Sequence, residues 1–397
     1  MLSARPDGVG IVTPPATRAD GTAVRAAEWT TAALGALLIL LVLLANHDWL
    51  DRHLLPHIFM PRREQILIWW IERSLALVAA LALIFPGRRW VGRRVGAGKG
   101  RDLAWGIGLT LGAVVMALLV SEAVLRTGDW KNLERWAEQE EPLRQHDPVI
   151  GWVNVPNHVG FERYDGRTIR YDHDRGGRRV ARFDRPVDPG RPSILFTGES
   201  IMLGYRLNWD QTAAAQIGAA TGLQTVNLSV NGYGADQEWM LLRRQLPQFT
   251  TPRVVVALFA PLLIERSLDS HRPHLDTALQ WHAAKPGWRL EKLFRKLLLY
   301  HSEAKIDRGI ASTRSSMQAI VAAARARHAV PLILVPEFGP EQPNERRLRE
   351  QVLTGLPYVR VELDPRWSIP HDGHPDARAN RVIAQAVVTA LAKAPTP

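Results

Sequence analysis

The chain has 397 residues, enough for two or more domains, and carries a formal net charge of +11. No long basic run follows the N-terminal third, so no nucleic-acid partner is expected, whereas polyanionic glycans and anionic lipid head groups fit the charge. The absence of cysteine fits an extracytoplasmic domain without disulfide bridges, and no phosphate loop or dinucleotide motif predicts a cofactor.

Three apolar segments lie in the first third of the chain. Residues 29–46 and 103–121 contain no charge, and residues 65–86 contain one acidic and one basic residue. Each is long enough to cross a bilayer as a helix. We predict a three-helix transmembrane region over residues 29–126 behind a tail of residues 1–28. A cleaved signal peptide is the alternative for the first segment, but the two further apolar segments argue against it.

The loop between the second and third apolar segments is cationic. It has one acidic residue, Asp102, and its basic residues are Arg88, Arg89, Arg93, Arg94, Lys99 and Arg101. Since loops rich in Lys and Arg stay in the cytoplasm, this loop and the N-terminus are predicted to be cytoplasmic. Everything after about Arg126 then lies in a periplasm-like space. We predict a multi-pass protein of the inner (plasma) membrane whose partners include membrane lipid.

Two charged residues interrupt the second apolar segment. Glu72 and Arg73 are costly inside a bilayer, and adjacent residues on a helix point in different directions, so they do not simply pair with each other. Packing against polar groups of neighbouring helices is favoured over a polar path or a substrate contact.

Residues 127–192 form a polar connector. Residues 129–141 have the pattern of a short exposed helix. Alternating runs flank Asp165-Gly166, a dipeptide typical of tight hairpin turns. We therefore predict a small β-rich lead-in with a hairpin, packed against the domain that follows.

From Ser193 onward, apolar strands alternate with helices. The predicted strands are residues 193–197, 224–230, 253–260, 330–337 and 357–363. The predicted helices are residues 209–221, 235–246, 312–328, 343–354 and 376–393. Because the strands are continuously apolar, helices should cover both faces of a parallel sheet. The predicted fold class is α/β, a three-layer α/β/α domain over residues 193–397.

One interval, residues 261–311, shows no strand pattern and is long for a plain connection, so it is predicted to be an insertion. Within it, residues 288–299 place apolar side chains on one face of a helix. This helix could pack on the core, which is the default, cap the active site, or dock on the membrane surface.

Two short motifs carry the chemistry. Ser200 follows the first predicted strand in the turn Gly198-Glu199-Ser200, and Asp372-Gly373-His374 precedes the last helix. Open α/β sheets bind ligands at the carboxyl edge of their strands. A serine there becomes a nucleophile when a histidine takes its proton and an aspartate orients that histidine. The alternatives are that Ser200 is only a helix N-cap and that His371 takes the place of His374.

The order and context of these motifs resemble the SGNH/GDSL hydrolase family over about residues 145–395. The resemblance rests on a Gly-Asp-Ser-like turn with a following glycine, an asparagine-to-glycine segment after the second strand, and an Asp-x-His segment before a final helix. In this chain these are Gly198-Glu199-Ser200 with Gly204, the segment 227–234 with Asn227 and Gly232, and Asp372-Gly373-His374-Pro375. Membrane-anchored members are similar also in Glu122…Arg126 and in Gly151-Trp152…Pro156-Asn157.

The resemblance implies an SGNH-type fold and acyl transfer without a cofactor. It assigns Ser200 as the nucleophile, His374 as the base that removes and returns the proton, and Asp372 as the residue that holds the imidazole. The main-chain N–H groups of Ser200 and Gly232 would form the oxyanion hole.

Two departures from the family pattern stand out. Glu199 replaces the usual aspartate and keeps its charge. The family also has an asparagine after the third strand that helps to bind the oxyanion, whereas residues 259–264 here are apolar. Loss of one such donor typically costs about 10²–10³ in rate. A replacement donor from residues 264–272 is one expectation that the sequence leaves open.

Metal binding is not predicted. His271 and His274 with Asp269 and Asp276 could be drawn as ligands, as could the histidine pair near the C-terminus, but neither group has a recognised zinc spacing. Solvated polar loops explain both better.

The leading hypothesis is a membrane-tethered serine esterase that hydrolyses O-acyl, expected to be acetyl, esters of a cell-surface glycan or a small ester. An O-acyltransferase using the same three residues is the second hypothesis. A degenerate domain that binds glycan or scaffolds an envelope assembly is the third, and it is motivated by the missing amide.

Overall fold

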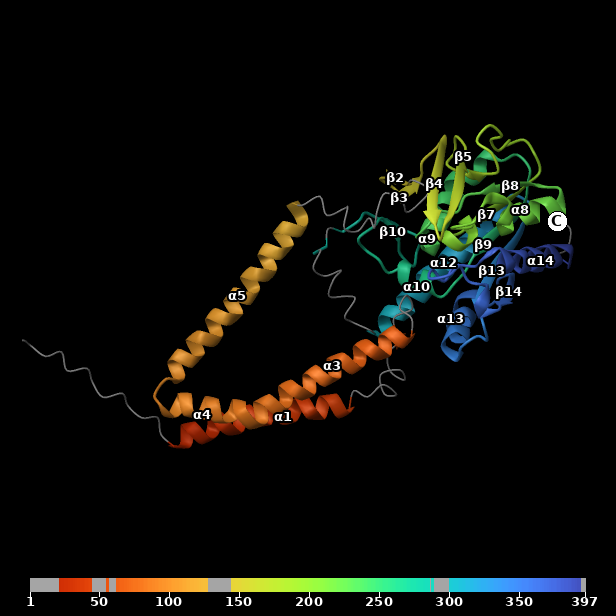
Figure 1. Cartoon of the computed structure of the whole chain (residues 1–397). Helices are drawn as coiled ribbons and strands as arrows, with labels where there is room; N and C mark the ends of the chain where they lie inside the picture. Colours follow the sequence, from red (N-terminus) through yellow and green to blue (C-terminus); the bar gives the residue numbers. More distant parts are fainter. Residues whose placement is uncertain are drawn as a thin grey trace, which may run out of the picture. The chain divides into compact units, whose positions relative to one another are not determined.

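The computed structural model describes residues 21–44, 55–56, 62–127, 144–285, 287–288 and 300–393 (Figure 1). The chain divides between Gly128 and Asp129 into a helical unit and an α/β unit, apart from two short segments. Each unit is described by itself.

The helical unit holds three helices long and apolar enough to cross a membrane. Its elements are α1 (Gly21–Leu44), α3 (Arg62–Ala82), a π-helical turn (Leu83–Gly87), α4 (Arg88–Gly96) and α5 (Gly100–Thr127). The predicted apolar segments lie within these spans, except for the end of the first, which falls outside the described residues. Within α3, the guanidinium of Arg73 lies 4.6 Å from the centroid of the Trp69 ring.

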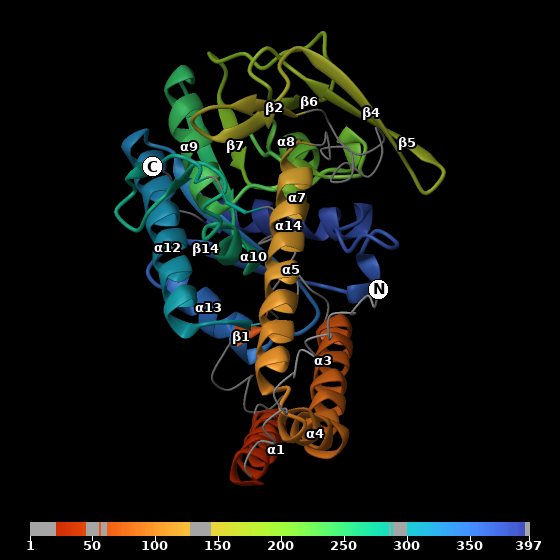
Figure 2. The ribbon, with the colours of Figure 1, turned by 90° about the vertical axis from the view of Figure 1, so that its left-hand side faces the viewer.

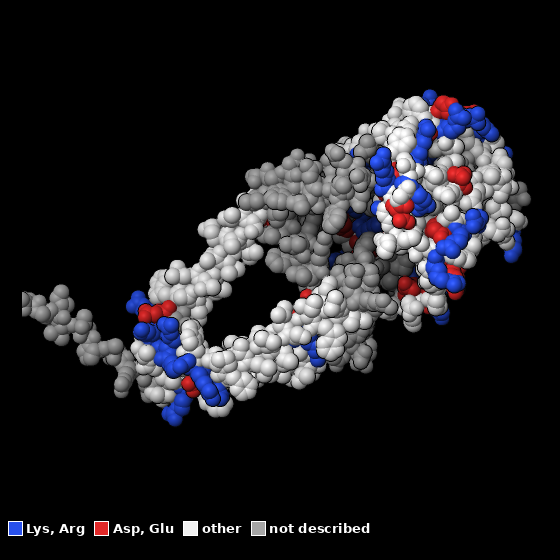
Figure 3. Space-filling model, in the orientation of Figure 1, with Lys and Arg blue, Asp and Glu red and all other residues white. Residues whose placement is uncertain are grey.

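The cationic segment 87–102 is not an open loop, and in this the sequence interpretation was wrong. Pro86 cannot donate a helical hydrogen bond, and the π-turn around it carries the helix on into α4. Helix α4 has the sequence RRWVGRRVG, and basic side chains gather where it lies (Figure 3). A short break at residues 97–99 separates α4 from α5.

An eight-stranded sheet forms the centre of the α/β unit. The strand order is β14-β13-β9-β7-β8-β6-β5-β4. The bounds are β4 His158–Tyr164, β5 Arg167–His173, β6 Arg179–Val180, β7 Ser193–Thr197, β8 Gln224–Asn227, β9 Pro252–Leu258, β13 Val330–Phe338 and β14 Tyr358–Leu363. The five strands predicted after Ser193 pair in parallel, although β8 ends three residues earlier than predicted.

The connector hairpin adds to this same sheet. Strands β4 and β5 pair antiparallel around a turn in which Asp165 and Gly166 both have positive φ. Strand β6 pairs with β5 and joins β8 through the single pair Arg179 and Asn227. The sheet is therefore mixed, and the lead-in continues it rather than only packing against it. A smaller pair, β2 (Arg144–Asp147) and β3 (Gly151–Asn154), precedes the hairpin.

Helices cover both faces of the sheet, which confirms the three-layer α/β/α class. Helices α9 (Ala235–Gln245) and α12 (Glu303–Ala326) pack on each other and on one face, as Figure 2 shows. Helices α8 (Ala213–Thr221) and α14 (Ala377–Lys393) pack on the other. Helix α13 (Pro343–Leu353) lies against α12.

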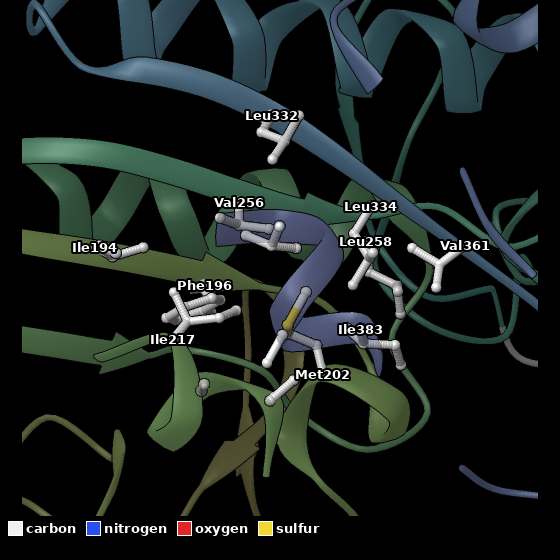
Figure 4. Packing of buried hydrophobic residues seen from close by; sticks show 14 of the residues in the cluster. Ile194, Phe196, Met202, Ile217, Val256, Leu258, Leu332, Leu334, Val361 and Ile383 are labelled. Atoms are coloured by element: carbon white, nitrogen blue, oxygen red, sulfur yellow. The ribbon is translucent and has the colours of Figure 1, made fainter. Parts of the chain in front are cut away.

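The main core lies between the sheet and the pair α8 and α14 (Figure 4). Alternate strand residues point to this face because side chains alternate along a strand. They include Ile194, Phe196, Val254, Val256, Leu258, Leu332, Leu334, Val361 and Leu363. The continuous apolar strands predicted from the sequence are thus buried on both faces.

The interval 261–311 contains more structure than predicted. It holds α10 (Leu262–Arg266) and the strands β10 (His274–Leu275) and β11 (Trp281–His282), which pair antiparallel. Helix α12 begins at Glu303, nine residues before the predicted start. The amphipathic stretch is described only at its first residue, and residues 289–299 lie outside the described residues, as does the helix predicted at 129–141.

The remaining elements are β1 Leu55–Pro56, β12 Tyr300–His301, α7 Ser200–Leu203 and the 3₁₀ turns Trp209–Gln211, Leu246–Gln248 and Pro365–Trp367.

Candidate active site

Ser200 is the first residue of the short helix α7, directly after β7. Glu199 is the N-cap, and its carboxylate accepts a hydrogen bond from the N–H of Ile201 at 3.0 Å. The interpretation of Ser200 as a mere N-cap is therefore wrong. Gly198 allows the sharp turn, since a Cβ there would lie 2.6 Å from Cβ of Met202. The Ser200 hydroxyl is thus held at the carboxyl edge of the sheet.

Ser200, His374 and Asp372 form one hydrogen-bonded chain. His374 Nε2 lies 2.8 Å from Ser200 Oγ, and His374 Nδ1 lies 2.6 Å from Asp372 Oδ1. The Tyr205 ring packs edge-to-face on the His374 ring, with 5.0 Å between centroids. His371, the sequence alternative, is exposed and has a left-handed backbone. The structure brings together the three residues that the resemblance singled out.

A second contact reaches the Ser200 hydroxyl from Glu199, whose Oε2 accepts a very short hydrogen bond from Oγ. The hydroxyl has one proton, so His374 and Glu199 are alternative acceptors for it. This contact was not predictable from the motif, which indicates only that an acidic residue stands next to the serine.

Arg206 lies behind the Asp372 carboxylate. Its Nη1 is 2.9 Å from Asp372 Oδ2, and its Nε donates to Glu162 Oε1 at 2.8 Å. The guanidinium also lies 3.6 Å from the centroid of the Tyr164 ring. Burial opposes ionisation of Asp372, but the hydrogen bond with His374 and the charge of Arg206 outweigh it and lower the pKa of Asp372. The hairpin β4–β5, through Glu162 and Tyr164, thus fixes the cation that holds Asp372.

Replacing Arg206 by asparagine is expected to lower the reactivity of Ser200 toward an activated aryl acetate, measured as kcat/KM, by about tenfold, the value of one charge-assisted hydrogen bond. Asparagine suits the test because Arg206 has a φ of 59°, a conformation that asparagine tolerates. Steady-state kinetics would measure the effect, with Arg182→Asn as the control, since Arg182 forms an exposed ion pair with Asp184. Equal activity of a folded Arg206→Asn protein would contradict the role.

Arg179 of β6 supports the other end of α7. This arginine is fully buried and donates to the carbonyl oxygens of Leu203 and Gly204 at 2.7 Å each, and to that of Leu207 at 2.5 Å. The last carbonyls of a helix lack partners within it and need donors from elsewhere. The lead-in therefore satisfies the backbone that follows Ser200.

The predicted oxyanion donors lie on two turns. Gly232 has a φ of 81°, which explains the glycine, and its turn is fixed by bonds from Arg144 Nη1 and Trp152 Nε1 to the carbonyl of Asn231. Asn227 donates to the carbonyl of Met202 at 3.0 Å, tying this segment to α7. The main-chain N–H groups of Ser200 and Gly232 donate no hydrogen bond to any of the described residues.

Where the family has an asparagine, this chain has buried apolar residues. Phe259, Ala260, Leu263 and Ile264 are all at most 5% exposed. The next polar side chain along this segment that reaches Glu199 is Arg266, at the end of α10. A replacement donor was predicted from residues 264–272, and within that range Arg266 contacts the nucleophile turn through Glu199.

A cluster of buried charges lies beneath the nucleophile turn. Burial would raise the pKa of Glu199, but Arg266 and His374 outweigh it and lower that pKa. Glu238 of α9 is also buried, with no hydrogen-bond partner for its carboxylate in the described part of the chain. Burial, and next the charge of Glu199, raise the pKa of Glu238 well above its usual value, which favours its neutral form.

Two residues of the first candidate metal group, His271 and Asp276, are each engaged with a neighbouring side chain. His271 Nδ1 contacts Asp269 at 3.1 Å, and Asp276 contacts His282 rather than His274. Over the residues that the structure describes, no group of three or more His, Asp or Glu side chains is arranged to hold a metal ion.

The chain is similar to known proteins in structure but not in sequence. No protein-family model and no curated protein matches the chain. Similar solved structures include a lipolytic protein of the G-D-S-L family from Desulfitobacterium hafniense (11% identity, covering 50% of this chain and 98% of that one, TM-score 0.33). Others are TesA (17%, 50% and 97%, 0.34) and the esterase EstA from Pseudoalteromonas (14%, 51% and 97%, 0.31). Two of these structures are thus named as a lipolytic protein of the G-D-S-L family and as an esterase. At these identities and TM-scores, the similarity does not define the chemistry of the site.

Proposed function

We propose that the protein is a membrane-anchored serine esterase that hydrolyses O-acyl esters through Ser200, His374 and Asp372. The observation that carries the proposal is the chain of hydrogen bonds, 2.8 Å and 2.6 Å long, that links the three side chains at the carboxyl edge of the sheet. Serine, base and orienting carboxylate at these distances are the requirements for nucleophilic acyl transfer.

The mechanism has two halves. Ser200 Oγ attacks the ester carbonyl while His374 Nε2 takes its proton, and the oxyanion forms against the N–H groups of Ser200 and Gly232. His374 then gives the proton to the leaving alcohol oxygen, and an acyl-serine remains. Water, deprotonated by His374, attacks the acyl-serine, and the acid leaves with Ser200 regenerated. Asp372 keeps the imidazole oriented and stabilises its cation throughout.

The membrane helices suggest where the reaction takes place. Three apolar helices precede the catalytic unit, and basic residues concentrate on α4. Cationic segments stay on the cytoplasmic side, so the catalytic unit is assigned to the periplasmic side of the inner membrane. Acylated glycans of the cell surface are among the esters available on that side, and we propose an O-acetyl glycan as the natural substrate.

Labelling with a fluorophosphonate probe tests the proposal. The full-length protein in detergent should be phosphonylated once per chain, at Ser200, because the probe reacts only with an activated serine. Ser200→Ala should remove the label, and peptide mass spectrometry would locate it. A folded wild-type protein that takes up no probe would exclude the esterase and favour a non-catalytic domain.

Product analysis then separates hydrolysis from transfer. With an acetylated glycan or an aryl acetate, an esterase releases acetate at a rate independent of added glycan hydroxyls. Acetate that appears on an added glycan instead of in water would identify a transferase that uses the same three residues.

A further inference from the structure

The oxyanion hole lacks its third donor, yet a cation lies beside it. Arg266 Nη1 donates to Glu199 Oε2 and to the carbonyl of Tyr233, both at 3.0 Å. Glu199 immediately precedes Ser200, and Tyr233 immediately follows Gly232. A single nitrogen of Arg266 therefore bridges the two turns whose N–H groups are proposed to bind the oxyanion.

We propose that Arg266 is a positioning residue that compensates for the missing amide by clamping these two turns together and by balancing the Glu199 carboxylate next to Ser200. This inference rests on the proposed esterase function. Arg266 acts through Glu199 and Tyr233 and is not required to touch the substrate.

The clamp matters for geometry because two donors must converge on one oxygen. Donors act on an oxyanion only when they are held about 3 Å from the position it will occupy. With an asparagine absent from residues 259–264, the relative position of Ser200 and Gly232 depends on other links between their turns. Arg266 provides a side-chain link between these turns, beside the main-chain hydrogen bond from Val230 N–H to the Gly198 carbonyl at 3.1 Å and the bond from Asn227 to Met202.

The clamp matters for charge because Glu199 is an anion at the reacting serine. Its side chain is 1% exposed, and it contacts Ser200 Oγ. Without a cation, this carboxylate would repel the negative charge that develops on the substrate oxygen in the transition state. Arg266, with its side chain 20% exposed, supplies the balancing charge from a partly buried position, where screening by water is weak.

Arg266 is itself held in place. Its carbonyl accepts a hydrogen bond from Arg272 Nη2 at 2.5 Å, and Arg272 forms a buried ion pair with Asp236 at 2.9 Å. The second nearby carboxyl, Glu238, favours its neutral form and so does not compete with Glu199 for the charge of Arg266. The cluster then balances the cations Arg266 and Arg272 against the anions Glu199 and Asp236.

The test is a double-mutant cycle on Arg266 and Glu199 in the full-length protein, with an aryl acetate as substrate. Arg266→Met should lower kcat by about 10²-fold, because the turns that carry the two proposed oxyanion donors lose their link and Glu199 loses its balancing charge, while KM changes less than about threefold. Glu199→Gln combined with Arg266→Met should recover at least about tenfold of that loss, because the unbalanced anion is gone. A purely structural role would not be rescued in this way.

The controls separate the possible failures. Arg243→Met removes an exposed arginine of α9 and should leave kcat unchanged. Arg266→Lys keeps the charge, and we expect it to lose only about tenfold in kcat. If Arg266→Met does not fold, the kcat of Arg266→Lys tests the clamp in its place. Wild-type kcat in a folded Arg266→Met or Arg266→Lys protein, or no rescue in the double variant, would overturn the clamp alone. Wild-type hydrolysis that does not depend on Ser200 would overturn the proposed esterase function instead.

Discussion

Replacement of His374 by asparagine is expected to lower the kcat/KM of ester hydrolysis by about 10⁴-fold, since the proposed mechanism uses His374 to pass the serine proton to the leaving group. The reason is the geometry of His374, whose two nitrogens contact Ser200 Oγ and Asp372 Oδ1. An asparagine side chain cannot shuttle a proton. Initial rates with an aryl acetate on the purified full-length protein would measure the loss.

His371→Asn is the matched control for this experiment. His371 lies three residues earlier in the same loop, is exposed, and has a φ of 60°, which asparagine tolerates. We expect its kcat/KM to stay within about twofold of wild type, because surface substitutions of this kind disturb little. If the two variants lost activity equally, the assignment of His374 as the base would be wrong.

The second large effect concerns the stability of the α/β unit. Phe196→Ala should lower the free energy of unfolding by about 3–5 kcal/mol, the usual result of emptying a buried phenylalanine site. Phe196 is fully buried on β7, in the middle of the sheet, and packs in the core cluster shown in Figure 4. The cavity would open four residues from Ser200, so loss of labelling should follow the loss of structure on heating.

Phe161→Ala provides the comparison on the edge of the same sheet. Phe161 lies on β4 and is 60% exposed, so its removal should change the free energy of unfolding by no more than about 0.5 kcal/mol. Thermal unfolding of the two detergent-solubilised variants would give the difference. A similar shift in both proteins would show that the core of the catalytic unit lies elsewhere.

Much of the fold was predictable because strands buried on both faces leave a strong pattern. The run Ser193 to Thr197 is predicted and observed with the same bounds. The mixed character of the sheet was not predictable. Strand β6 has only two residues, and its link to β8 is a single pair, which no periodicity in the sequence can show. The start of α12 was missed because residues 303–311 mix four charged side chains with apolar ones and include Gly309.

The candidate site was predictable where it follows local motifs and hidden where it depends on long side chains. Ser200, Gly232, Asp372 and His374 each lie in a turn whose glycines mark it in the sequence. Arg206 and Arg266 lie in no motif. Arg266 reaches Glu199 across 67 residues of sequence, and a flexible side chain of that length can point in many directions until the fold is known.

The support that strands β4 to β6 give to the site has a consequence for release of the α/β unit from the apolar helices. Arg179 donates hydrogen bonds to the carbonyl oxygens that follow α7, and Glu162 holds Arg206 behind Asp372. Both residues must therefore remain part of the folded unit that carries Ser200. A protease that cut before Arg144 would release an α/β unit that keeps these contacts. A cut between Val180 and Ser193 would separate both Arg179 and Glu162 from the fragment that carries Ser200 and Arg206, so the position of cleavage would decide whether the released unit keeps its site.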